Sequence, residues 1–120
     1  SENGLALAPN HLNPALNPDG ARTYSKKVLI FLSDGIPNIK QSDNTTINNF
    51  VSGNPDGEWF SGGSYSLERN ATLMQILQIQ AMGWKTHSIG LGLGADKTLM
   101  DRMARMAGTA VKDPNNPNGP

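Results

Sequence analysis

The feature that most constrains the fold of this 120-residue chain is an apolar run, VLIFL, which ends in Ser-Asp-Gly. Residues 28–32 are continuously apolar and do not alternate with polar residues. A strand with one solvated face alternates, whereas a strand that is covered on both faces reads as an unbroken apolar segment. The run therefore predicts a strand over residues 26–33 that is buried on both faces inside a parallel sheet.

Helical and strand patterns surround this run. We expect helices over residues 1–16, 67–82 and 97–107, and a second strand over residues 84–91. Asp96 is placed to cap the start of the last helix, and Gly83 and Gly108 to end the last two helices. Strands that alternate with helices indicate right-handed crossovers and parallel pairing, which gives the α/β class. Because two strands are few for a stable sheet, we expect the chain to be part of a larger α/β domain.

The remaining sequence is polar and irregular. Residues 35–67 are rich in Asn, Ser and Gly, and we expect residues 41–65 to form a polar loop insertion. Trp59, Phe60 and Tyr65 interrupt this segment, and we expect them to hold it against the body of the domain. The domain is assigned to residues 1–111, and residues 112–120, KDPNNPNGP, to a linker or disordered tail.

Composition excludes several classes of protein. Ten acidic and ten basic residues give a net charge of zero, without the basic stripe of a nucleic-acid-binding protein. No apolar run approaches the ~20 residues of a membrane span. The absence of cysteine excludes disulfides, thiolate metal sites and cysteine nucleophiles.

Asp34 is the principal candidate for a functional residue. It follows the first strand, and open α/β sheets bind ligands outside the carboxyl ends of their strands. The residue could form a turn with Gly35, act as a catalytic acid, or ligate a metal ion. Ser33, Gly35 and Asn38 are the further candidates at this rim, Gly35 for a sharp turn and Asn38 for a turn cap or a ligand contact.

Enzyme motifs are incomplete around Asp34. The common phosphohydrolase signature has a second aspartate two residues on, where this chain has Ile36. The second strand leads into GLGLGAD, but Ala95 stands where a dinucleotide fingerprint has its third glycine. A flexible connection explains this loop more simply. A Mg²⁺-dependent phosphoryl-transfer or nucleotide-binding domain that uses Asp34 and the loop from Gly90 to Gly94 stays open as the alternative.

Several motifs in order resemble the von Willebrand factor A domain. They are Ser33-Asp34-Gly35 after a buried strand, AMGW at residues 81–84, IGLG at residues 89–92, and a helix from Leu99 to Ala104 followed by Gly108. The segment ENGLALA, residues 2–8, is similar to the family helix that follows a metal-binding threonine. The resemblance covers most of the chain except residues 41–65 and the tail. Within the family, KKVLIFLSDGIPN and the polar insertion are most similar to bacterial proteins associated with Tad-type pilus assembly.

The resemblance implies a doubly wound, Rossmann-like sheet with a metal-ion-dependent adhesion site at its carboxyl end. Of the family's ligands only the aspartate of the Asp-Gly motif is carried over, onto Asp34. The strand with the family's Asp-x-Ser-x-Ser motif, the threonine, and the final strand and helix are expected to lie outside this sequence. The implied cofactor of the intact domain is Mg²⁺ or Mn²⁺, which a single carboxylate would hold weakly.

The function that follows from the resemblance is binding without catalysis. We expect an adhesion module of a bacterial cell envelope or exterior, such as one used in pilus assembly, whose metal bridges to an acidic group on a protein partner. An exposed edge of the first strand would also favour self-association.

Overall fold

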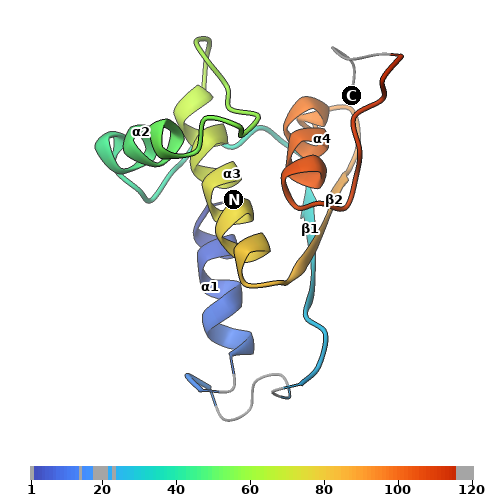
Figure 1. Ribbon diagram of the computed structural model, residues 1–120. Coiled ribbons are helices and arrows are strands. Elements are labelled where there is room, and N and C mark those ends of the chain that lie inside the picture. The colour runs from blue at the N-terminus through green and yellow to red at the C-terminus, as the bar shows by residue number, and fades with distance from the viewer. Residues whose placement is uncertain (1, 14, 18–21, 23, 116–120) are drawn as a thin grey trace.

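The computed structural model describes residues 2–13, 15–17, 22 and 24–115 of the chain (Figure 1). These residues form, in order, α1 (Glu2–Leu12), β1 (Val28–Ser33), α2 (Asn44–Gly53), α3 (Ser66–Ala81), β2 (Lys85–Gly90) and α4 (Lys97–Met106). β1 and β2 pair in parallel, from Val28 opposite Lys85 to Ser33 opposite Gly90. The predicted α/β class and the parallel pairing are therefore confirmed.

Helix α3 lies at the centre of the fold. It packs against α1, α2, α4 and β2, and buried residues occur on several of its sides. A helix that is buried on several sides belongs inside a core instead of on its surface. The core joins α3 to its neighbours through the side chains of Leu5, Leu73, Ile76, Ile79, Leu99 and Met103.

The helix ends follow the predicted signals. Asp96 caps α4, because its carboxylate accepts a hydrogen bond from the Leu99 N–H at 3.1 Å. Gly83 and Gly108 follow α3 and α4 with φ of 79° and 72°, which a glycine adopts without strain. The first helix ends at Leu12, so the prediction that it extends to residue 16 was too long.

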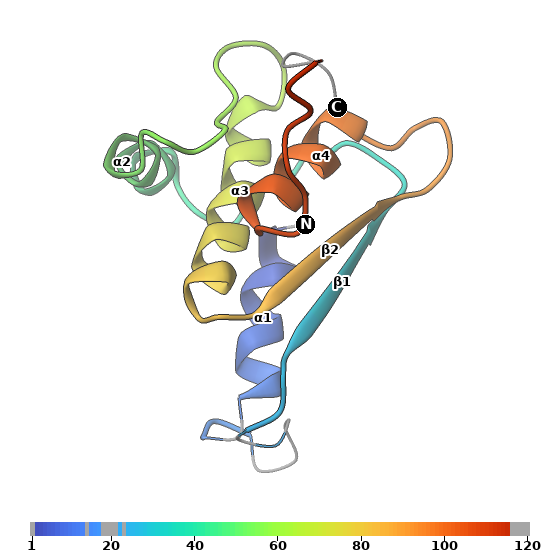
Figure 2. The same cartoon turned by 45° about the vertical axis from the view of Figure 1, so that its right-hand side comes forward.

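The prediction that β1 is buried on both faces is wrong for the described residues. Leu29 and Phe31 pack against the core, whereas Val28, Ile30 and Leu32 are 52%, 57% and 56% exposed. The reason is that the described helices lie on one side of the sheet (Figure 2). An apolar stripe on the other face stays open to solvent.

The predicted loop over residues 41–65 contains a helix, α2, so this prediction was wrong for residues 44–53. Asp43 caps α2 by accepting a hydrogen bond from the Thr46 N–H at 2.8 Å. The sequence NTTINNFVSG has low helix propensity and buries only Ile47, so its apolar periodicity is weak. The rings of Phe50 and Trp59, 6.0 Å apart and edge-to-face, fasten the helix to the segment that follows it.

Two arginines of α4 hold the rest of the insertion. The Arg102 guanidinium lies 3.9 Å from the centre of the Phe60 ring and donates to the carbonyl oxygens of Glu58 and Trp59. The hydrogen bond from Arg105 lowers the pKa of the Glu58 carboxyl. The expectation that Trp59 and Phe60 pack against the body is confirmed. It is wrong for Tyr65, which is 47% exposed.

The end of the described chain is irregular. Of the segment assigned to a linker, residues 112–115 are exposed and belong to no helix or strand, and residues 116–120 lie outside the described part. Among the described residues, no helix combines the length and the apolar character that crossing a membrane requires.

A leucine pair tests this division between the core and the open face. Leu99→Ala should lower the free energy of unfolding by about 2–5 kcal/mol, because Leu99 is fully buried and leaves a cavity. Leu32→Ala removes the same atoms from an exposed position and should change it by about 0.5 kcal/mol or less. Urea unfolding followed by circular dichroism measures both, and equal losses would contradict the one-sided sheet.

Candidate functional site

Asp34 lies at the carboxyl end of β1, at an exposed position directly after Ser33. Ser33 pairs with Gly90, and the Leu91 N–H donates to the Ser33 carbonyl oxygen at 2.8 Å. The turn at Asp34 and the loop from Gly90 to Gly94 therefore leave the sheet side by side. The structure brings together the two candidate segments that are more than fifty residues apart in the sequence.

The glycine-rich loop folds back onto the Asp34 turn. A Cβ placed on Gly94 would lie 2.8 Å from the Asp34 carbonyl oxygen, a distance that side chains do not tolerate. Gly92 has a φ of 74°, in the left-handed region that favours glycine. The close approach of this loop to Asp34 and its left-handed backbone therefore explain why glycines occupy these positions.

The other rim candidates have different environments. The Ser33 hydroxyl donates to the Gly35 carbonyl oxygen at 3.1 Å, so it serves the turn. Gly35 has a negative φ, and a Cβ there would meet no atom within 4 Å. Asn38 is exposed. It follows the buried Pro37 and lies four residues after Asp34 in the sequence.

A hollow of about 380 Å³ lies beside Asp34. Gly4 and Leu5 from the first turns of α1 form one wall, and residues 29–34 form the other. The hollow therefore follows the edge of β1 that faces away from β2, and Asp34 stands at its end.

The Asp34 carboxylate is the candidate metal ligand at this rim. The described residues contain no group of three or more His, Cys, Asp or Glu side chains placed to share a metal ion. Asp34 supplies one carboxylate, and Mg²⁺ keeps several waters where a protein offers so few oxygens. Tight binding of a divalent ion would require ligands in addition to those described here.

The N-terminus of α4 is capped by a negatively charged side chain of the chain itself. The Asp96 carboxylate is 8% exposed and accepts from the Leu99 N–H and from Arg69 Nε, the latter at 2.6 Å. Phosphate sites at helix N-termini use free backbone N–H groups and a positive field. Here an aspartate takes that place, and Arg69 compensates its charge, so this geometry does not favour a nucleotide phosphate.

Glu2 is a structural residue that the sequence reasoning missed. Its side chain is 2% exposed, and it accepts hydrogen bonds from the Gln41 N–H at 2.6 Å and from the Ser42 N–H and hydroxyl. Burial by itself would raise the pKa of Glu2, but the hydrogen bonds from Ser42 and Gln41 outweigh it and lower the pKa. Glu2 thereby ties the chain that follows the Asp34 turn to α1. An acidic residue at the start of an apolar helix is the only sequence signal for this role.

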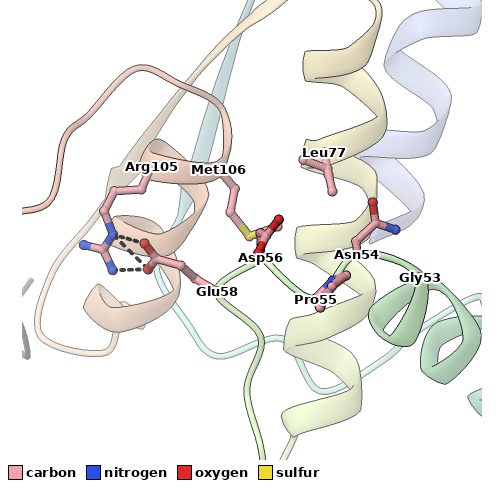
Figure 3. Close-up of a pocket in the computed structure, with 9 residues that line it drawn as sticks. Gly53, Asn54, Pro55, Asp56, Glu58, Leu77, Arg105 and Met106 are labelled. Carbon is pink, nitrogen blue, oxygen red and sulfur yellow. Dashed lines mark hydrogen bonds and ion pairs between the residues drawn. The ribbon is translucent and has the colours of Figure 1, made fainter.

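A second hollow, also of about 380 Å³, lies between the end of α2, α3 and α4 (Figure 3). Asn54 and Asp56 face Leu77 and Met106 across it, while the Glu58 carboxylate points to Arg105. Arg105 also pairs with Asp101, so the charges at this wall are satisfied within the chain. Of the charged residues that line the hollow, Glu58 and Arg105 pair with each other, whereas Asp56 is exposed.

Comparisons with known proteins find no relative. A scan against protein-family models gives no match, and searches of curated proteins and of solved structures find no similar protein. Functional inference for this chain therefore depends on its own geometry and on its motifs.

A single substitution tests the tie between α1 and the segment after Asp34. Glu2→Gln places amide hydrogens against the N–H donors of Gln41 and Ser42. At pH 7 it should lower the free energy of unfolding by about 1.5–3 kcal/mol, the range for hydrogen bonds to charged groups. Because the folded pKa of Glu2 is lowered, the unfolded chain takes up the proton first. The stabilisation is thus complete above about pH 4.3, the unfolded value, and is lost as the pH falls through the folded pKa.

Urea unfolding at pH 7 and pH 3 measures this difference. Wild type and Glu2→Gln should differ clearly at pH 7, and the difference should be smaller at pH 3. Asp56→Asn, at an exposed position, is the control and should have little effect at either pH. A difference for Glu2→Gln that stays constant between the two pH values would contradict the role assigned to the carboxylate.

Proposed function

We propose that the chain is a non-enzymatic binding module of von Willebrand factor A type, which engages a protein partner at the carboxyl edge of β1 and β2. The observation that carries the proposal is the exposed Asp34 at this edge, with the loop from Gly90 to Gly94 beside it. Edges of this kind are where open α/β sheets bind ligands. The motifs around Asp34 support the family, and the geometry supports the place of the site.

A divalent cation would let the carboxyl end of the sheet bind an acidic group of the partner. In the intact domain Asp34 would supply one oxygen ligand to Mg²⁺ or Mn²⁺, and an acidic group on the partner would supply another. Such ions accept carboxylate oxygens and exchange their remaining waters. Asp34 then sets the charge of the site and performs no chemical step. Ligands from residues beyond those described would be needed for tight binding.

Two features favour binding over catalysis. General acid–base chemistry uses a positioned partner group, and the described residues form no group of three or more His, Cys, Asp or Glu side chains around Asp34. The start of α4 holds Asp96 in place of a phosphate. By the motif resemblance, the proposed setting is the envelope or exterior of a bacterium, including pilus assembly.

A paramagnetic titration tests the cation half of the proposal. Mn²⁺ added to the ¹⁵N-labelled chain should broaden the amide signals of Gly35, Asn38 and Gly92 most strongly. Binding should be weak, with a dissociation constant on the order of a millimolar, because one carboxylate holds the ion. Asp34→Asn should abolish the localised broadening and leave the remaining spectrum unchanged.

The matched control is Asp56→Asn, which removes another exposed aspartate and should leave the broadening at the rim intact. Broadening that centres away from Asp34, or that survives Asp34→Asn, would contradict the assignment. Micromolar affinity in the 120-residue chain would contradict the single-ligand account of the site.

A further inference from the structure

A cluster of basic residues lies at the end of the sheet opposite Asp34. The two strands are parallel, so both begin at this end. Lys26 and Lys27 precede β1, and Lys85 is the first residue of β2. Arg22 lies beside them, because the ammonium group of Lys27 donates to the Arg22 carbonyl oxygen at 2.8 Å. We call these four residues the basic pole.

A hollow of about 540 Å³ opens at the basic pole. Its lining combines the three lysines with the turn that joins α3 to β2, namely Met82, Gly83 and Trp84. The Gly83 N–H donates to the Gln80 carbonyl oxygen at 2.9 Å, and the Trp84 N–H donates to that of Ile79 at 3.4 Å. These bonds occupy carbonyl groups that would otherwise repel an anion at the end of α3.

The described residues do not neutralise the charge of this pole. Residues 24–33 and 70–95 contain no Asp or Glu. None of the ion pairs found among the described residues involves Lys26 or Lys85. Asp19, the acidic residue nearest in the sequence, lies outside the described part. Two lysines at the start of the strands therefore keep their positive charges available to an anion.

The acidic residue at the other end of the sheet is too distant to cancel this charge. From Val28 to Asp34 the chain advances about 3.3 Å per residue, or roughly 20 Å in all. The Debye length in physiological salt is about 8 Å. A positive potential therefore persists at the basic pole, although the formal net charge of the chain is zero.

Exposed apolar side chains accompany the basic ones. Tyr24 is 100% exposed and directly precedes the residues that line the hollow. Met82, which lines it from the other side, is 49% exposed. In Figures 1 and 2 both strands begin at the lower end of the sheet, on the side of the turn that follows α3. Lysines beside an aromatic ring are typical of surfaces that contact lipid headgroups and the acyl chains below them.

We propose that the basic pole attaches the protein to the surface of an anionic phospholipid bilayer. Lys26 and Lys85 bind lipid phosphates, and the hollow between them receives one phosphate of a headgroup. Tyr24 and Met82 enter the interfacial layer beside it. A purely ionic polymer would use the lysines alone, whereas a bilayer uses the charged and the apolar side chains together. Each basic residue near an anionic membrane strengthens attachment about fivefold.

Attachment at this end would also orient the protein. The strands run from the basic pole to Asp34, so the carboxyl end of the sheet would point away from the bilayer. This orientation rests on the proposed function, because it leaves the Asp34 edge open to a protein partner. The attachment itself uses other residues and no divalent cation.

Vesicle sedimentation tests the attachment. The 120-residue chain, in EDTA so that no cation bridges Asp34 to a phosphate, should bind vesicles of phosphatidylcholine with phosphatidylglycerol and not those of phosphatidylcholine alone. Lys26→Glu and Lys85→Glu should each lower the partition coefficient about fivefold or more. Tyr24→Ser should lower it severalfold, and a rise in sodium chloride should release the wild type.

The matched control is Lys97→Glu, which makes the same charge change at an exposed lysine at the start of α4. It should leave the partition coefficient within about twofold of the wild-type value, because it lies at the far end of the sheet. Asp34→Asn should bind vesicles like the wild type, so this result is separate from the Mn²⁺ titration. Circular dichroism checks the fold of each variant, and Lys26→Gln, with about a fivefold loss, replaces Lys26→Glu if that variant unfolds.

Three results would overturn the proposal. The first is a wild type that does not bind the anionic vesicles. The second is a loss in Lys97→Glu as large as the loss in Lys26→Glu. The third is displacement by inorganic phosphate beyond that caused by chloride at equal ionic strength, which would assign the basic pole to a soluble phosphate compound.

Discussion

The burial of α3 is the constraint on which the rest of this structure depends. Helices α1, α2 and α4 are short, and short helices have little stability in water unless they pack against something. Each of them packs on α3, and β2 contacts it as well. The side chains of Leu73, Ile76 and Ile79 join α3 to α1 and α4 in one core. The position of Asp34 follows from this arrangement, because β1 pairs directly with β2, and β2 packs against α3 and α4.

Much of the fold was predictable from interactions between residues that are close in the sequence. The predictions that were wrong depend on contacts between residues that are far apart. Asp96 and the glycines that follow the helices act within a few residues, so the ends of α3 and α4 could be read from the sequence. α2 escaped prediction because its stability depends on Ile47 and on the contact between Phe50 and Trp59. The apolar run of β1 predicted cover on both faces, but a sequence pattern does not say which residues, or which molecule, provide the cover.

The same distinction between local and long-range interactions applies to the candidate site. The place of Asp34 at the rim was predictable, because it depends only on where a strand ends. The contacts that fix the surrounding loops join residues far apart, since Glu2 binds Ser42 at a separation of 40 residues and Arg69 binds Asp96 at 27. No periodic pattern encodes such pairs. They hold the segments on either side of the rim, and Asp34 itself stays exposed.

Amide hydrogen exchange along β1 tests most directly the claim that the described part of the chain pairs β1 with β2 alone, through one edge. The N–H groups of Leu29 and Phe31, which face β2, should exchange slowly, and those of Ile30 and Leu32, which face the other edge, should exchange quickly. Exchange rates without this alternation would contradict the account.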